Sequence, residues 1–164
     1  MTNVALKEKR ITKEEQLYGW IEKAIFYSKK ERGTKLTPKP GEFYTADLGV
    51  NVGSEINGIR PFLILTSTNY NDRSGTVTGI PCSRKEFAKK GQIQITEDIL
   101  EEGELTGIIK TEMITTISKG RLGHYIGRLN RKGITRVGKA MENFFVPMRH
   151  SKKERNHYGL QESY

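Results

Sequence analysis

The sequence lacks the features that mark secreted, membrane-spanning and zinc-binding proteins. Its 164 residues include one cysteine, Cys82, which excludes an internal disulfide and a zinc finger and is typical of a reducing compartment. No apolar run reaches the roughly 18 residues of a transmembrane helix, so we expect no membrane contact. The first ten residues, MTNVALKEKR, have no apolar core of the kind that a signal peptide needs. We therefore expect a cytoplasmic protein.

Common catalytic motifs are also absent. The sequence contains no GxxxxGK[ST] phosphate loop, no HExxH and no GxSxG. It has three histidines, of which only His124 lies in the expected folded part, so a mechanism based on two histidines is hard to build. The acidic stretch DILEEGE (98–104) is interpreted as a surface turn and not as a site for a divalent metal. Cys82 lies in an apolar strand-like segment, where we expect it to be buried and unreactive.

Negative charge is scarce relative to positive charge. The net charge is +9 and the isoelectric point is near 9.6. Residues 1–40 contain ten Lys and Arg but five Asp and Glu, so much of the excess lies near the N-terminus. Such a surplus favours a polyanionic partner, because binding releases condensed counterions. A solvated basic surface that only aids solubility is the alternative, and charge alone does not separate the two.

Three segments follow one another along the chain: a helical extension with a linker (1–40), a β-rich domain (41–147) and a basic polar tail (148–164). Thr12 and Glu15 form a capping box at the start of the extension. An apolar stripe at helical spacing follows, made of Leu17, Trp20, Ile21, Ala24 and Ile25. We expect this stripe to dock on its own barrel or on a neighbouring subunit. Its role could be structural, polyanion-binding or inhibitory.

The middle segment is rich in strand signals. Alternating or β-branched runs bounded by turn residues predict strands at EFYTADL (42–48), FLILTS (62–67), TVTGIPCS (76–83), QIQIT (92–96) and GIIKTEMITTI (107–117). A helix then begins at Asn130, a good N-cap, and ends at Pro147, with an apolar face of Ile134, Val137, Met141, Phe144 and Phe145. This order predicts an α+β, predominantly β fold, with a small, strongly bent antiparallel sheet or barrel closed by a C-terminal helix.

One loop stands out, GSEINGIRP (53–61). Gly53 and Gly58 favour unusual backbone angles, and Glu55 and Arg60 place opposite charges in one short stretch. An apolar strand follows directly, so the rigid core would hold Arg60 still, as chemistry requires.

Three blocks of the sequence resemble the MazF/PemK family of toxin endoribonucleases. They are GEFYTADLGVNVGSEINGIRPFLIL, TVTGIPCS and TEMITTISKGRLGHYIGRL, which occur in order between about Gly41 and Phe145. The resemblance implies an SH3-like barrel with a C-terminal helix that forms homodimers. It also implies cleavage of single-stranded RNA without a metal or other cofactor, and a cognate antitoxin protein as partner.

The resemblance also assigns site residues. It places the catalytic pair at Arg60 and Ser83, with Glu55 in the loop that lines the RNA groove. Candidate RNA-binding residues are Ser54, Asn57, Tyr44, Asn69 and Arg84. Alternation along the strand makes one of Phe43 and Tyr44 a core residue, so only one can face RNA. Family members often carry a polar or charged pair where this chain has Met113 and Thr115, so the resemblance does not assign the substrate-specific side of the groove.

The chemistry of RNA cleavage fits these residue types. The 2′-OH of RNA attacks the adjacent phosphorus, so the protein must align the groups, stabilise charge and manage two protons. Arg60 offers a fork of donors, Ser83 adds a hydroxyl donor, and Glu55 or water serves as base. Whether Arg60 also donates a proton to the leaving oxygen stays open. Two other functions remain: a non-enzymatic inhibitor of the gyrase-poison type on the same barrel, and a nucleic-acid-binding module that does not cut.

Overall fold

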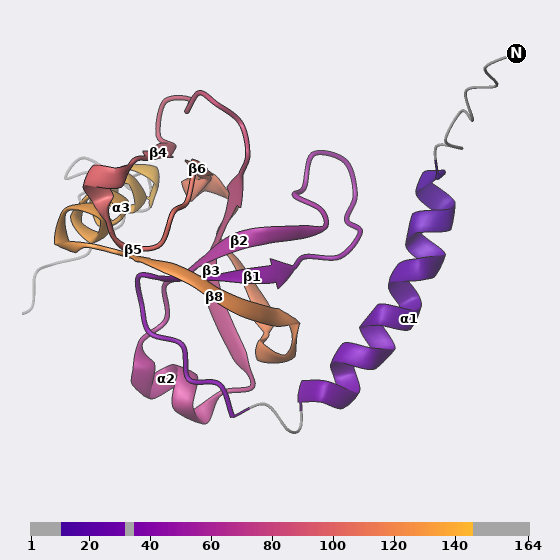
Figure 1. The fold of residues 1–164 in the computed structure, drawn as a ribbon. Coiled ribbons are helices and arrows are strands. Elements are labelled where there is room, and N and C mark those ends of the chain that lie inside the picture. The colour runs from indigo at the N-terminus through magenta and orange to yellow at the C-terminus, as the bar shows by residue number, and fades with distance from the viewer. Residues whose placement is uncertain (1–10, 32–34, 146–164) are drawn as a thin grey trace, which may run out of the picture.

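The computed structural model describes residues 11–31 and 35–145, and its centre is a strongly bent antiparallel sheet (Figure 1). The four strands that position the site are β1 (Glu42–Asp47), β2 (Ile59–Ile64), β3 (Thr76–Ser83) and β8 (Leu122–Leu129). The shorter strands are β4 (Ile93–Ile95), β5 (Leu100–Glu102), β6 (Gly107–Ile109) and β7 (Thr115–Ser118). The strand order is β4-β6-β3-β2-β1-β8-β5, and β7 also pairs with β3.

Helical segments surround this sheet. The longer ones are α1 (Lys13–Glu31), α2 (Thr68–Arg73) and α3 (Arg131–Phe145). Three 3-10 turns are η1 (Glu97–Ile99), η2 (Thr111–Met113) and η3 (Lys119–Arg121). Figure 1 shows α1 beside one end of the sheet and α3 at the other. No helix in the described ranges is both long enough and apolar enough to cross a membrane. The predicted tail at 148–164 lies outside the described residues.

The strand boundaries differ from the expected ones in informative places. β2 begins at Ile59, earlier than the expected strand, so that Arg60 belongs to the strand and not to the loop. The expected strand 107–117 is two strands, β6 and β7, separated by the turn η2. The acidic stretch 98–104, expected to be a surface turn, contains the paired strand β5. The elements α2 and β8 were not predicted as such, because neither has a clean apolar period.

The start of α1 confirms the capping box. The Thr12 amide donates to Glu15 Oε2 (2.7 Å), and the Glu15 amide donates to Thr12 Oγ1 (3.2 Å). The expected docking of the apolar stripe on its own barrel is wrong for most of its members. Leu17, Ile21 and Ile25 are 42%, 54% and 52% exposed. The helix is rotated so that a more polar face meets the barrel instead.

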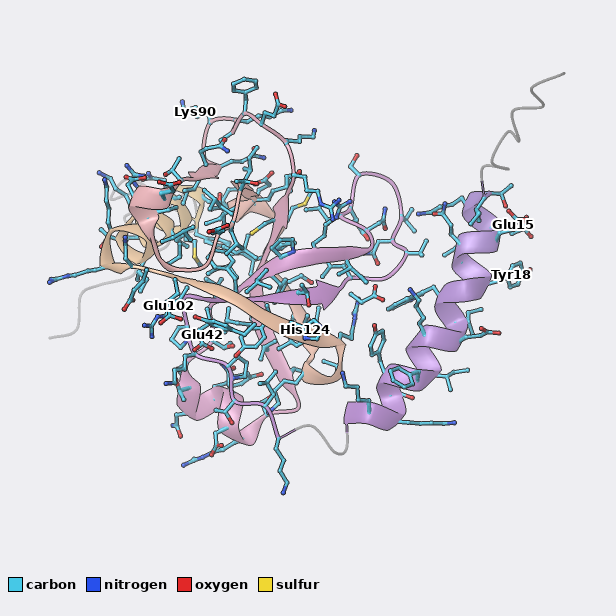
Figure 2. All side chains as sticks on the ribbon, viewed as in Figure 1. Glu15, Tyr18, Glu42, Lys90, Glu102 and His124 are labelled. Atoms are coloured by element: carbon cyan, nitrogen blue, oxygen red, sulfur yellow. The ribbon has the colours of Figure 1, made fainter. Side chains whose placement is uncertain are left out.

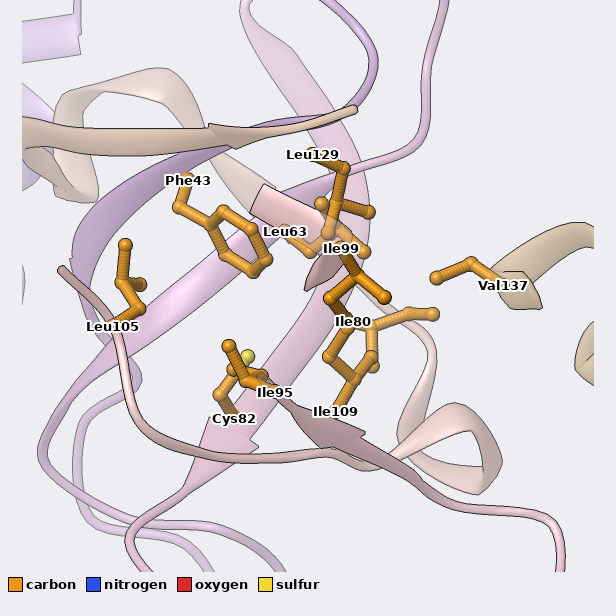
Figure 3. Packing of buried hydrophobic residues seen from close by; sticks show 10 residues of the cluster. All are labelled: Phe43, Leu63, Ile80, Cys82, Ile95, Ile99, Leu105, Ile109, Leu129 and Val137. Atoms are coloured by element: carbon orange, nitrogen blue, oxygen red, sulfur yellow. The ribbon is translucent and has the colours of Figure 1, made fainter. Parts of the chain in front are cut away.

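The sheet carries apolar side chains on both faces, in two clusters. The first cluster (Figure 3) contains Phe43, Leu63, Ile80, Cys82, Ile95, Ile99, Leu105, Ile109, Leu129 and Val137. The second contains Tyr44, Ala46, Leu48, Phe62, Ile64, Val77, Ile117 and Leu122. Burial on both faces explains why strand β2 has a continuous apolar run. It also corrects the expectation for Phe43 and Tyr44: the two side chains point to opposite faces, and both are buried.

The helix α3 closes one end of the first cluster. The Asn130 side chain caps it, because Oδ1 accepts from the Gly133 amide (3.0 Å), which confirms the predicted N-cap. Val137 is buried in the cluster and Met141 packs partly against it. The other members of the expected apolar face, Ile134, Phe144 and Phe145, are 52%, 50% and 41% exposed.

Candidate active site

The loop between β1 and β2 (residues 48–58) is braced by its own amide side chains. Asn51 Nδ2 donates to the carbonyls of Leu48 (3.1 Å) and Ile56 (2.8 Å). The Asn51 amide donates to Oδ1 of Asn57. Asn57, predicted to bind RNA, therefore uses its side-chain oxygen to hold the loop. These hydrogen bonds within the loop hold its shape next to Arg60.

Arg60 follows this loop on β2 and is half-buried. Its Nε donates to the carbonyl oxygen of Asn57 (3.0 Å), which anchors the guanidinium at one edge. Within the described ranges, its two terminal Nη groups have no hydrogen-bond partner and no carboxylate within ion-pair distance. The side chain is thus held in place while its fork stays available for an anion.

Arg60 and Ser83 lie on the neighbouring strands β2 and β3, each two residues beyond the pair Phe62–Pro81 that ends the ladder between these strands. Their own strand partners are Ala46 of β1 for Arg60 and Ile108 of β6 for Ser83. Side chains two residues apart on a strand share a face, so Arg60 lies on the face of Phe62 and Ser83 on that of Pro81. Phe62 belongs to the second apolar cluster, so both residues continue that face of the sheet.

A groove of about 650 Å³ opens on this same face. Its lining comes from the 48–58 loop (Leu48, Asn51, Val52, Ser54, Glu55, Ile56), from β3 (Pro81), from the segment 113–117 and from Arg121. Ser54 and Glu55 are exposed on its loop wall, as predicted residues of the groove. Met113 and Thr115, singled out in the sequence, lie on the other wall. Arg60 and Ser83 do not line the hollow itself but extend its face along β2 and β3.

Ser83 ends β3 and is half-buried. Its Oγ accepts a long hydrogen bond from the Lys85 amide (3.4 Å), which leaves the hydroxyl proton free to be donated. Arg84 is exposed immediately after it, where its charge extends the site toward solvent.

Of the predicted RNA-binding residues, Ser54 lines the groove, whereas Asn57, Arg84, Tyr44 and Asn69 do not. The last two lie in other parts of the fold. Tyr44 is 7% exposed, and its hydroxyl donates to Glu42 Oε2 (3.1 Å). Burial and the Glu42 carboxylate raise the pKa of Tyr44 to about 12. The side chain therefore belongs to the core and stays uncharged at ordinary pH. Asn69 is exposed on α2, which Figure 1 shows at the opposite end of the sheet from the 48–58 loop. Alternation and turn propensity could not reveal either placement.

Three residues at or beside the groove were not predicted from the sequence: Arg121, Asn51 and Asp47. Arg121 lines the groove from η3, and its Nε donates to the Asp47 carbonyl (2.7 Å). Burial lowers the pKa of Arg121, an effect that the nearby Asp47 carboxylate opposes. Asp47 is 5% exposed, and its carboxylate accepts from the Gly49 amide (3.0 Å). A charged residue that ends an apolar strand was the one signal that could have pointed to Asp47.

No group of three or more His, Cys, Asp and Glu side chains in the described part of the chain is arranged to hold a metal ion. Cys82 is buried in the first cluster as expected, and burial raises the pKa of its thiol.

Comparison with known proteins identifies the family. The family described as the PemK-like, MazF-like toxin of type II toxin–antitoxin systems matches residues 39–145. The chain belongs to this family. The matched residues of this MazF-like protein include the groove, Arg60 and Ser83, whereas α1 lies outside them.

Individual relatives agree with this assignment. Endoribonuclease EndoA of Bacillus subtilis (strain 168) is 31% identical over 105 residues, which cover 63% of this chain and 90% of that protein. A crystal structure of MazF (Form-I) from Deinococcus radiodurans has a TM-score of 0.60 at 14% identity and covers 68% of this chain and 98% of its own. An endoribonuclease from Mycobacterial species, in complex with its cognate antitoxin, has a TM-score of 0.52 at 21% identity, covering 65% and 91%. These likenesses confirm the predicted fold, a nearly closed barrel with a C-terminal helix.

Proposed function

We propose that this MazF-like protein is the toxin of a toxin–antitoxin pair and a metal-independent endoribonuclease that cuts single-stranded RNA. The observation that carries the proposal is the position of Arg60 and Ser83 on neighbouring strands, each two residues along its strand from the pair Phe62–Pro81, of which Pro81 lines the groove. The family match and the 31% identity to a protein named an endoribonuclease support the same conclusion.

The reaction uses a nucleophile that RNA itself supplies. The 2′-oxygen forms a bond to the adjacent phosphorus, and the bond from phosphorus to the 5′-oxygen breaks. One proton leaves the 2′-OH and another is delivered to the departing 5′-oxygen. The products are a 2′,3′-cyclic phosphate and a 5′-OH. The protein has to align the attack, stabilise the phosphoryl oxygens and move these two protons.

Arg60 and Ser83 stabilise the phosphoryl group. Because the Asn57 carbonyl fixes Nε, the terminal Nη groups of Arg60 can donate to two phosphate oxygens without first being ordered. The Ser83 hydroxyl donates to the same group from the neighbouring strand. Arginine stays protonated at ordinary pH, so Arg60 stabilises charge and donates a hydrogen bond to the leaving 5′-oxygen, and it is not the base. The proton that the 5′-oxygen gains comes from water.

Glu55 is the carboxylate of the groove wall and the proposed base. It is exposed on the braced loop, where it takes the proton of the 2′-OH directly or through a water molecule. Ser54 beside it and Arg84 beyond Ser83 bind the flanking sugar–phosphate chain.

The partners follow from charge and from the open edges of a small sheet. We propose that the protein is a homodimer, which covers sheet edges and the exposed apolar side chains of α3. An acidic, unstructured segment of the cognate antitoxin would occupy the groove and compete with RNA, since the chain carries a net charge of +9.

The decisive experiment incubates the purified full chain with a long RNA in excess EDTA and maps both new ends. Cleavage with 2′,3′-cyclic phosphate and 5′-OH ends supports the proposal. RNA that is bound but intact indicates a binding module, and RNA that is neither bound nor cut indicates a protein inhibitor of another target. Cleavage that disappears in EDTA and returns with a divalent cation overturns metal independence.

A further inference from the structure

Arg121 is held in the same way as Arg60, by a hydrogen bond from Nε to a backbone carbonyl. Arg121 lines the hollow, and its Nε is fixed by the Asp47 carbonyl at 2.7 Å. Its guanidinium carbon lies 5.2 Å from the ring centre of Trp20, which covers one face of the fork. Among the described residues, the terminal Nη groups of Arg121 have no hydrogen-bond partner and no carboxylate within ion-pair distance.

The unpaired guanidinium of Arg121 favours the binding of an anion. Arg121 is half-buried, and a desolvated guanidinium is costly unless an acceptor faces its donors. The nearest acidic residue does not neutralise it through an ion pair, because the Asp47 carboxylate is engaged by the Gly49 amide and by two side chains of α1. An RNA strand that follows the groove past Arg60 would bring a backbone phosphate to this unpaired fork.

The support for Arg121 comes from α1. Besides Trp20, the Tyr27 hydroxyl donates to Asp47 Oδ2 (3.0 Å), and Lys23 Nζ lies 3.6 Å from the same oxygen. Lys13 Nζ donates to the carbonyl of Asn51 (2.7 Å), a residue of the braced loop that lines the groove. The face of α1 that touches the barrel therefore contacts the groove wall at several points.

The helix supports the groove wall without filling the groove. With α1 docked, the hollow still measures about 650 Å³, and no residue of α1 is among those that line it. Apart from Trp20, which covers Arg121, the large apolar side chains Leu17, Ile21, Ile25 and Phe26 of α1 stay exposed. An inhibitory plug would place them in the hollow, so the geometry favours a supporting role.

We propose that Arg121 is a second phosphate-binding residue of the RNA groove and that α1, through Trp20, is its positioning element. This inference rests on the proposed function, because it takes single-stranded RNA as the ligand. It gives a role in substrate binding to a helix that lies outside the residues that match the family.

The test measures RNA binding separately from cleavage. The probe is a random-sequence 2′-O-methyl RNA 12-mer, which lacks the attacking hydroxyl, and its affinity is measured by fluorescence anisotropy at several salt concentrations. The variants are Arg121→Ala, Trp20→Ala and Trp20→Phe. The matched control is Tyr18→Ala, an aromatic of the same helix that is 64% exposed and points away from the barrel (Figure 2).

Loss of one phosphate contact lowers the slope of log affinity against log salt by about 0.7 for single strands. We expect this loss in Arg121→Ala, a similar or smaller loss in Trp20→Ala, recovery in Trp20→Phe, and no change in Tyr18→Ala. In cleavage assays on long RNA, Arg121→Ala should raise KM more than it lowers kcat, because the contact binds substrate away from the reacting atoms.

Each contrary outcome has a distinct meaning. A wild-type protein that cuts RNA while Arg121→Ala keeps the full salt slope overturns this inference and leaves the proposed function standing. A slope that falls in Arg121→Ala but not in Trp20→Ala overturns the role of α1, and faster cleavage by Trp20→Ala makes the helix an inhibitor. A wild-type protein that neither binds nor cuts RNA overturns the proposed function and this inference together.

Discussion

The indole ring of Trp20 lies directly over Gly49, at the point where any other residue would carry its Cβ. A Cβ built on Gly49 would come within 2.5 Å of two indole carbons, and the backbone there has φ = 79°. Gly49 thus meets two requirements at once: a left-handed backbone and close approach of an aromatic ring. The contact joins the only tryptophan of the chain to the start of the active-site loop.

Gly49→Ala should therefore displace α1 while the barrel stays folded. The added methyl group clashes with Trp20, and the positive φ adds strain of about 1–3 kcal/mol. Tryptophan fluorescence reports the change, since Trp20 moves into water and its emission shifts to longer wavelength. The control is Gly53→Ala, which has φ = 59° but nothing within 4 Å of its Cβ. An equal emission shift in both variants would show that loop strain, not the clash, moves the helix.

Arg60→Ala should abolish RNA cleavage and leave the circular dichroism spectrum unchanged, because a half-buried strand-end arginine contributes little to the core. Arg60→Lys should rescue little, since a point charge cannot replace the bidentate fork. Arg73→Ala, an exposed arginine on α2, controls for the loss of one positive charge. Activity of Arg60→Ala above about a tenth of wild type would contradict a catalytic role, given the usual cost of losing an oxyanion donor.

Ser83→Ala should slow cleavage by about 10- to 1,000-fold. Removal of a single oxyanion donor typically costs about 100- to 1,000-fold, and Ser83 shares this role with Arg60. The measurement is the single-turnover rate on RNA at saturating protein. Ser28→Ala, which removes an exposed hydroxyl on α1, provides the control. An unchanged rate in Ser83→Ala would leave Ser83 as a structural strand end.

The docking of α1 should weaken in alkaline solution. Burial raises the pKa of Tyr27 above its usual value of 10, and the hydrogen bond to Asp47 adds to this effect. A raised pKa means that the contribution of Tyr27 to docking is complete below about pH 10 and is lost as the pH rises through the folded-state value. Trp20 emission measured against pH in the wild type and in Tyr27→Phe checks this. Other groups that titrate are common to both proteins, so identical curves would exclude Tyr27 as the cause.

The protein should be a homodimer in solution. Light scattering at micromolar concentration should give about twice the mass of the 18.7 kDa chain. A dimer is expected because a small barrel leaves sheet edges and apolar side chains to cover. A monomer at this concentration would refute the prediction.

Local signals predicted much of this fold. β3 occupies the predicted residues 76–83 because a β-branched run there is bounded by turn residues. The capping box of Thr12 and Glu15 and the N-cap Asn130 also formed as predicted, since each involves residues three apart in the sequence. The loop next to Arg60 was singled out because its glycines and charges are unusual in any regular element, and in the structure it lines the groove.

The features that were not predicted depend on contacts between residues far apart in the sequence. Such contacts produce no periodic pattern in the sequence. Trp20 was placed in an apolar stripe, but its partners are Gly49 and Arg121, and together they set the rotation of α1. One of Phe43 and Tyr44 was expected in the core and the other was free to face RNA, yet the bent sheet has an apolar cluster on each face and buries both. Arg121 lies in a short basic turn that shows no motif in the sequence. Its role becomes visible only in the structure, where Nε donates to the Asp47 carbonyl.

The position of Cys82 makes the opening of the barrel measurable. Its thiol is 1% exposed inside the first cluster, and burial raises its pKa, so an alkylating reagent reacts only when the barrel opens. Trp20, at the contact between helix and barrel, senses the smaller event of helix release. The chain has one cysteine and one tryptophan. Thiol labelling therefore reports opening of the barrel, and tryptophan emission reports release of α1, without any engineered probe.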